Sequence, residues 1–278
     1  MTVMETKQEF AYASFAVPER TAKPRKRGLS MMIDWGMGVA RQRDTLESAG
    51  AYIDFAKVAA GISRFLPKDV LTQKLATYRE FGVSTSPGGA FAELAFAQRK
   101  YPEFVDETVA IGYDSIEVSD NLLHFEADEK AACIARAKQA GLKVFGEVGK
   151  KEGSMNDDEI VTDVHTCLQA GADWVYLEAV ELFTDGQIRG DLIARLQSEF
   201  GDEKLIYELP VVILHGMTRD YKHKVTTWLV RTLGTEVNLA NLEWDELYIA
   251  ELVRRGFAGD TSHPQGAYRL AGIETAEF

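Results

Sequence analysis

The sequence contains only two cysteines, Cys133 and Cys167, among 278 residues. They form no CxxC pair, so neither a disulfide framework nor a cysteine-rich metal site is expected. No apolar run approaches the roughly 18–20 residues that span a bilayer, and no signal-peptide pattern follows Met1. These absences predict a cytoplasmic protein without a membrane partner.

Positive charge is also scarce in this chain. There are 31 Lys and Arg against 43 Asp and Glu, which gives a net charge of −12 and argues against nucleic acid as the main partner. The basic run KPRKR at residues 23–27 is typical of a solvated arm. The glycine fingerprints GxGxxG and GxxxxGKS/T, which bind nucleotide phosphates, follow none of the expected strands.

Glycines, in contrast, recur at intervals of about thirty residues, at positions 50, 82, 112, 141, 171, 201 and 234. A helical pattern precedes each glycine, and a short run rich in β-formers follows most of them. Eight runs are expected as strands: residues 29–33, 52–55, 83–85, 115–118, 144–148, 174–177, 205–208 and 237–239. This period predicts an α/β protein with one (β/α)8 TIM barrel rather than a doubly wound sheet. The single barrel domain is expected over residues 28–260, between an N-terminal arm (1–27) and an irregular C-terminal tail (261–278).

Polar residues stand at the ends of these strands, where the catalytic groups of a barrel lie. They are Asp34, Lys57, Glu117, Ser119, Asp120, Glu147, Lys150, Lys151, Glu178, Glu181, Glu208, Asn238 and Asn241. Buried carboxylates require cations, and oxygen ligands suit Mg²⁺ or Mn²⁺. We therefore expect Glu117, Glu147, Glu178 and Glu208 to hold Mg²⁺. The alternative is a layer of ion pairs that fills the barrel mouth and performs no chemistry.

Two loops offer further candidates. The SPGG segment at residues 86–89 precedes an expected helix, so the backbone N–H groups of Gly88 and Gly89 are candidates for binding an anion. The same segment is also an ordinary turn. His215 and His223, after the seventh strand, are candidates for lining the site.

Taken in order along the strands, the sequence resembles the phosphosulfolactate synthase family of coenzyme M biosynthesis. The segments that carry the resemblance are 27–29, 33–34 with Gly36, 52–57, 87–89, 116–120, 147–151, 170–173, 237–241, 254–256 and 259–261. The resemblance implies a barrel that adds sulfite to C3 of phosphoenolpyruvate with Mg²⁺. It implies that Lys151 protonates C2, while Lys57 and Asp34 are further catalytic candidates. Ser119, Asn238 and Asn241 join the two loop glycines as candidates for binding a small anionic substrate.

The chain departs from the family pattern at two cations. Trp35 stands where the family usually has lysine, and Val180 stands where it usually has arginine. The basic loop after the seventh strand, with Arg219 and Lys222, is a possible replacement. Two alternatives therefore remain: a divergent member that adds another nucleophile to an enol or unsaturated carboxylate, and a non-enzymatic barrel of the plant heat-stress type. Barrel enzymes commonly form homo-oligomers, but no sequence feature identifies an interface.

Overall fold

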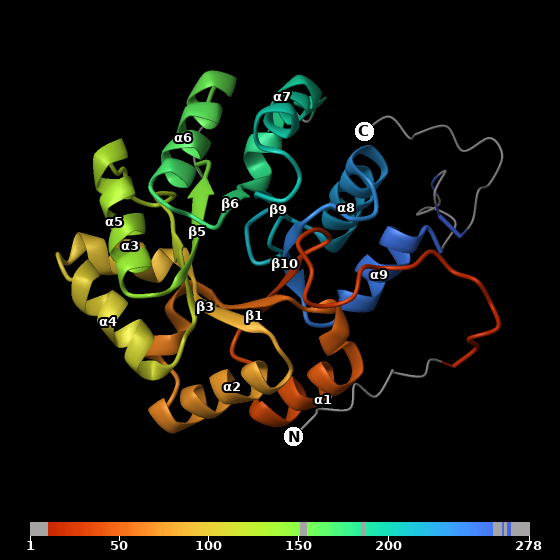
Figure 1. Cartoon of the computed structure of the whole chain (residues 1–278), viewed down its shortest axis with the longest axis horizontal. Helices are drawn as coiled ribbons and strands as arrows, with labels where there is room; N and C mark the ends of the chain where they lie inside the picture. The colour runs from red at the N-terminus through yellow and green to blue at the C-terminus, as the bar shows by residue number, and fades with distance from the viewer. Residues whose placement is uncertain (1–10, 151–154, 185–186, 258–262, 264–265, 268–278) are drawn as a thin grey trace.

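Eight parallel strands form a nearly closed barrel surrounded by helices in the computed structural model (Figure 1). The structure describes residues 11–150, 155–184, 187–257, 263 and 266–267. The barrel strands are β1 (Ser30–Asp34), β2 (Phe55–Val58), β3 (Ser84–Pro87), β4 (Ser115–Val118), β5 (Lys143–Val148), β6 (Trp174–Leu177), β9 (Leu205–Glu208) and β10 (Leu239–Glu243). Their order is β3-β2-β1-β10-β9-β6-β5-β4. The predicted single-domain (β/α)8 barrel is confirmed.

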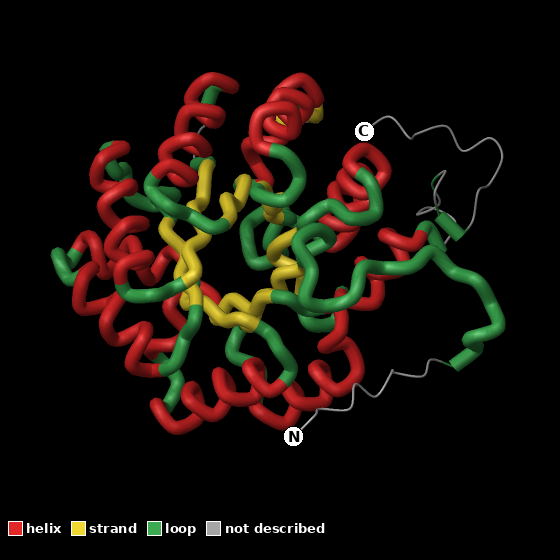
Figure 2. Tube along the Cα trace, in the orientation of Figure 1, coloured by secondary structure: helices red, strands yellow, loops and turns green. Residues whose placement is uncertain are grey.

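The helices form the outer layer, and the strands form the inner ring (Figure 2). The helices are α1 (Val39–Ala49), α2 (Lys68–Glu80), α3 (Gly89–Ala97), α4 (Tyr101–Ile111), α5 (Ala127–Gln139), α6 (Asp157–Gln169), α7 (Gly190–Phe200), α8 (Arg219–Leu233) and α9 (Leu247–Arg255). Short 3-10 turns cover Gly50–Tyr52, Ala59–Arg64 and Ala179–Leu182, and a small hairpin pairs β7 (Phe183–Thr184) with β8 (Gln187–Ile188). Within the described ranges, no helix is both long and apolar enough to cross a membrane.

The predicted alternation of helix, glycine and strand is clearest at Gly112. This residue ends α4 with φ of 110°, a left-handed conformation that favours glycine. The chain then reverses and enters β4 three residues later. The recurring glycines are therefore signals for the end of one helix and the return to the barrel wall.

Alternate residues of each strand face two separate cores. On β5, Val144 and Val148 belong to the large core between strands and helices. Phe145 belongs to a smaller core inside the barrel, together with Phe55 and Tyr176. Because this inner core is packed with side chains, the barrel is closed at its centre rather than open as a pore.

The edges of the sheet, β3 and β4, meet through side chains. Ser115 Oγ donates a hydrogen bond to the Thr85 carbonyl (2.7 Å), and the Thr85 N–H donates to Asp114 Oδ1 (2.7 Å). The other seven strand contacts are parallel backbone ladders. We refer to the β3–β4 contact as the seam.

Two strand predictions are wrong in position. The second strand begins at Phe55 rather than Tyr52, because Gly50–Tyr52 forms a 3-10 turn and Phe55 is the residue in register with Met31. The last strand begins at Leu239 rather than at residue 237 and continues to Glu243. The second shift decides which residues of the last strand reach the barrel mouth.

The basic run at residues 23–27 is not simply a solvated arm. Lys23 Nζ donates hydrogen bonds to three backbone carbonyls at the amino-terminal end of the barrel, those of Gly50 (3.2 Å), Ile53 (2.5 Å) and Phe81 (3.2 Å). Arg25 is buried and pairs with Asp54 (3.1 Å). The hydrophobic pattern gives no indication of this contact, because the buried residues are charged.

Candidate active site

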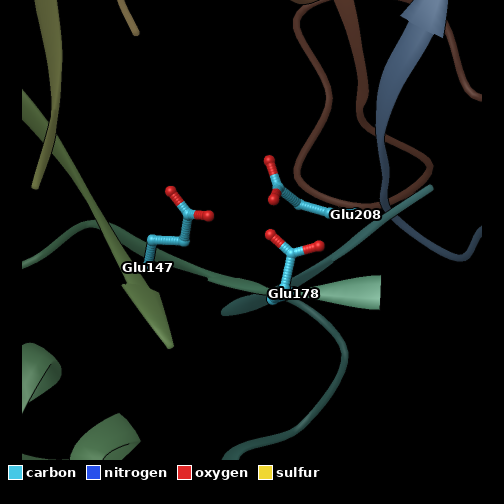
Figure 3. Close-up of side chains that lie close together, drawn as sticks. All are labelled: Glu147, Glu178 and Glu208. Atoms are coloured by element: carbon cyan, nitrogen blue, oxygen red, sulfur yellow. The ribbon is translucent and has the colours of Figure 1, made fainter. Parts of the chain in front are cut away.

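Three glutamates from neighbouring strands converge at the carboxyl-terminal mouth of the barrel (Figure 3). Glu147 lies on β5, Glu178 directly follows β6, and Glu208 ends β9. One carboxylate oxygen from each lies within 4.8 Å of the others, and all three residues are buried. We call these three residues the glutamate triad.

Lys57 places a positive charge beside the triad. Its Nζ lies 2.9 Å from Glu117 Oε2 and 2.9 Å from Glu208 Oε1. Burial opposes the charged form of the amine, but the surrounding carboxylates, Glu117 foremost, outweigh it and hold the pKa of Lys57 well above its ordinary value. Lys57 is therefore a fixed cation at neutral pH.

An aromatic layer closes the barrel beneath these charges. The ring of Phe145 stacks on Tyr176 at 4.8 Å between centroids and on Trp174 at 5.2 Å. Lys57 Nζ lies 5.2 Å from the centre of the Tyr176 ring. This aromatic floor has a low dielectric constant, which strengthens the charge interactions above it.

The expected set of four metal ligands divides into two groups. Glu147, Glu178 and Glu208 form the triad, whereas Glu117 accepts from Lys57 and from the Gly89 N–H (2.7 Å). The structure therefore places Glu117 beside the triad rather than within it. The bond from the Gly89 N–H also means that Glu117 occupies a donor of the predicted glycine loop.

The proposed anion cradle at Gly88 and Gly89 is already filled from within the chain. The Gly88 N–H donates to the Val58 carbonyl (3.1 Å), and the Gly89 N–H donates to Glu117. A Cβ on Gly89 would lie 2.4 Å from Ser119 Oγ, so this approach requires glycine. The structure contradicts an open cradle because a carboxylate already binds the amino terminus of α3.

Asp34 and Asn238 lie away from the triad. Asp34 is fully buried between the barrel wall and α2, where it accepts from Tyr78 Oη (2.7 Å) and pairs with Lys74 (2.8 Å). Asn238 precedes β10 and binds backbone groups, among them the Leu29 N–H (2.9 Å). The first side chain points outward from the wall, and the second lies at the amino-terminal end of the barrel.

Two other candidates lie at the carboxyl-terminal side of their strands. Ser119 follows β4, and its Oγ donates to Glu93 Oε1 (2.5 Å). Asn241 lies on β10 with φ of 62°, and its Nδ2 donates to the Leu209 carbonyl (3.3 Å). Lys151 lies outside the described residues, so its predicted role stays a prediction.

Several cations near the mouth contact carboxylates. Lys150 Nζ contacts the Asp120 carboxylate and donates to its carbonyl (2.9 Å). Arg219 and Lys222, expected in a loop, lie in the first turn of α8. Lys222 is buried and pairs with Glu246 (2.8 Å), and Arg219 pairs with Asp245 (2.9 Å). The positive charge at the start of α8 is therefore already balanced by acids. Of the two histidines suggested for this region, His215 is exposed.

Trp35 also binds an acid at the mouth. Its Nε1–H donates to Glu243 Oε2 (2.9 Å), and Glu243 is buried at the end of β10. Burial raises the pKa of Glu243, although Lys222 opposes the rise. Trp35, which stands where a lysine is expected, thus provides a neutral hydrogen-bond donor in place of a cation.

Three functional candidates escaped the sequence analysis: Glu93, Asn121 and Lys130. All three contact either Glu147 or the loop that follows β4. The only signal in the sequence is Glu93, a single acid within the apolar helix GAFAELAFA. A charge in such a helix indicates a buried partner but does not identify it.

Together, the fold and the glutamate triad define a barrel enzyme with an acidic centre at the carboxyl ends of its strands. Residues 18–260 match the family described as (2R)-phospho-3-sulfolactate synthase (ComA). The chain belongs to this phosphosulfolactate synthase family. The match begins at residue 18, so it includes the basic run at residues 23–27 that packs against the amino-terminal end of the barrel.

Individual relatives cover most of the chain. A phosphosulfolactate synthase of Methanothermobacter thermautotrophicus is 32% identical over 89% of this chain and 96% of its own length. One from Methanocaldococcus jannaschii is 31% identical over 91% of this chain and 97% of its own length. Protein HEAT-STRESS-ASSOCIATED 32 of Arabidopsis thaliana is 25% identical over 80% of this chain and 84% of its own length. The family relationship and the synthase relatives identify the chain as an enzyme of the lyase-type synthase class.

Proposed function

We propose that the protein adds sulfite to phosphoenolpyruvate in a Mg²⁺-dependent reaction and forms 2-phospho-3-sulfolactate. The observation that carries the proposal is the buried glutamate triad beside Lys57 in a chain of this family. The substrates are small anions, and the proposed location is the cytoplasm.

The triad fits a divalent cation in both charge and donor type. Two like charges within 4.8 Å of each other repel by about 3 kcal/mol or more at an effective dielectric constant of about 20. Lys57 supplies one positive charge but is shared between Glu208 and Glu117. Carboxylate oxygens are the donors that Mg²⁺ prefers, so Glu147, Glu178 and Glu208 would hold this dication.

The chemistry requires one new bond and one proton. The sulfur of sulfite attacks C3, the C2–C3 π electrons move into the carboxylate, and a proton is then added at C2. When bound, Mg²⁺ supplies positive charge that stabilises the carboxylate as its charge increases. We propose Lys151 as the proton donor, because it lies four residues after Glu147 in the sequence, just beyond the end of β5.

Lys57 has a separate role in this proposal. It is too firmly bound to two carboxylates, and its pKa is held too high, for it to lose a proton readily. We propose that it orients Glu208 and attracts the anionic substrate into the mouth. The aromatic layer under Lys57 excludes water from that side of the site.

A second candidate function is a related addition with a less highly charged substrate. The observation that favours it is Trp35, whose neutral indole binds Glu243 at the mouth. Each lost charge-assisted contact weakens anion binding by about 1.5–3 kcal/mol. A non-enzymatic role is disfavoured, because the chain is more similar to the synthases, at 31–32% identity, than to the plant heat-stress protein, at 25%.

The test is to incubate the purified protein with phosphoenolpyruvate, sulfite and Mg²⁺ and to detect phosphosulfolactate by mass spectrometry. We expect product with all three components and none when sulfite is left out or EDTA is added. A Glu178→Gln variant serves as the matched control for the triad. Absence of product from folded wild-type protein would refute the proposed substrates, and product formation unaffected by EDTA would refute the metal.

A further inference from the structure

A buried glutamate on α3 fastens the loop that follows β4. Glu93 is 2% exposed, and its hydrogen bonds reach across to this loop rather than along its own helix. Oε1 accepts from Ser119 Oγ (2.5 Å) and the Asn121 N–H (3.2 Å), and Oε2 accepts from the N–H groups of Leu122 (2.7 Å) and Leu123 (2.9 Å). One carboxylate therefore fixes residues 119–123, which we call the β4 loop.

The β4 loop in turn holds one member of the glutamate triad. Asn121 Nδ2 donates a hydrogen bond to Glu147 Oε1. Asn121 Oδ1 is also buried and accepts no hydrogen bond from the described residues. Because the side-chain amide is anchored through its own backbone N–H to Glu93, its direction toward Glu147 is set by the buried acid.

Lys130 holds the backbone of the same glutamate from the outer side. Its Nζ donates to the Glu147 carbonyl (2.7 Å), to Asp120 Oδ1 (3.0 Å) and to Asp163 Oδ2 (2.7 Å). Lys130 is 2% exposed, so these three bonds replace its hydration. Lys130 thus fixes the backbone of Glu147, and the contact from Asn121 helps to set the direction of its carboxylate.

We propose that Glu93 is a positioning residue for the candidate metal centre and that it acts through Asn121. This inference rests on the proposed function only in assuming that the triad binds a divalent cation. Groups that orient a metal ligand typically change metal affinity by about 10–100-fold when they are removed. Neither Glu93 nor Asn121 needs to touch the substrate for this effect.

The experiment is a calorimetric titration of Mn²⁺, alone, into the full-length protein and four variants. We expect Asn121→Ala and Glu93→Gln each to raise the Kd for Mn²⁺ by about 10–100-fold. We expect the double variant to bind Mn²⁺ no more weakly than Asn121→Ala, because Glu93 acts on the triad through Asn121 in this proposal. Glu236→Gln, which alters a partly buried ion pair with Arg20 at the other end of the barrel, is the matched control and should leave the Kd unchanged.

Thermal unfolding of every variant separates positioning from stability. Equal Kd values in wild type and Asn121→Ala would overturn the proposal, as would multiplicative effects in the double variant. A wild-type protein that binds no Mn²⁺ would refute the proposed centre itself, which is a distinguishable result. If Glu93→Gln does not fold, Ser119→Ala removes one hydrogen bond to Glu93 and should raise the Kd in the same direction; an unchanged Kd would overturn the proposal.

Discussion

Replacing Lys57 with methionine is expected to destabilise the protein strongly at neutral pH. The change keeps most of the side-chain volume but removes a cation shared by two buried carboxylates, each 2.9 Å from Nζ. Removing one partner of a buried ion pair typically costs about 3–5 kcal/mol. We expect Lys57→Met to lower the free energy of unfolding by about that amount, and Lys57→Met with Glu117→Gln to recover part of it.

The pH dependence follows from the Lys57 amine. Its folded pKa is raised above the value in the unfolded chain, which is about 10.5. Its stabilising contribution is therefore fully present below about pH 10.5 and is lost as the pH rises through the folded pKa. The difference between wild type and Lys57→Met should thus be constant between about pH 7 and 9.

Urea denaturation at pH 7, 8 and 9 measures this difference directly. Lys23→Met is the matched control, because Lys23 is a half-buried lysine that binds three backbone carbonyls at the opposite end of the barrel. A loss of less than about 1 kcal/mol for Lys57→Met, the range typical of exposed ion pairs, would refute the account of Lys57 as a buried structural cation.

Three further outcomes are expected. Lys151→Ala should lower turnover by at least about 100-fold with normal unfolding behaviour, as for loss of a general acid; near-normal steady-state rates would contradict its role. Asp34→Asn should lower the urea midpoint because it weakens the ion pair with buried Lys74, whereas turnover per folded molecule should persist. A stable but inactive variant would contradict the outward placement of Asp34. Burial raises the pKa of both Cys133 and Cys167 to about 12, so iodoacetamide at pH 8 should label neither thiol in the native protein. Rapid labelling detected by mass spectrometry would contradict their burial.

Much of the fold could be predicted from the sequence because it depends on local signals. The runs at 115–118, 174–177 and 205–208 coincide with β4, β6 and β9. The second strand was misplaced because Asp54, within the apparent β-run, accepts the Ser30 N–H and pairs with Arg25 instead of joining the wall. Such a contact between distant charged groups leaves no trace in hydrophobic periodicity.

The site was predictable only in part for the same reason. Glu147, Glu178 and Glu208 could be expected together because all three end parallel strands, which meet at one face of the barrel. The position of Asn238 depended on where β10 begins, and two residues of error moved it to the opposite end. Glu93 acts across 26–30 residues of sequence, a pairing that no motif specifies.

The seam gives the barrel wall uneven strength around its circumference. Seven neighbouring strand pairs of the wall are joined by backbone ladders. In contrast, β3 and β4 are joined by hydrogen bonds from side chains such as Ser115 and Asp114. Lys57 on β2 also reaches Glu117 on β4, so one ion pair spans that interval from within. We therefore expect the barrel wall to open first at the seam, and the Lys57–Glu117 ion pair at the mouth opposes that opening.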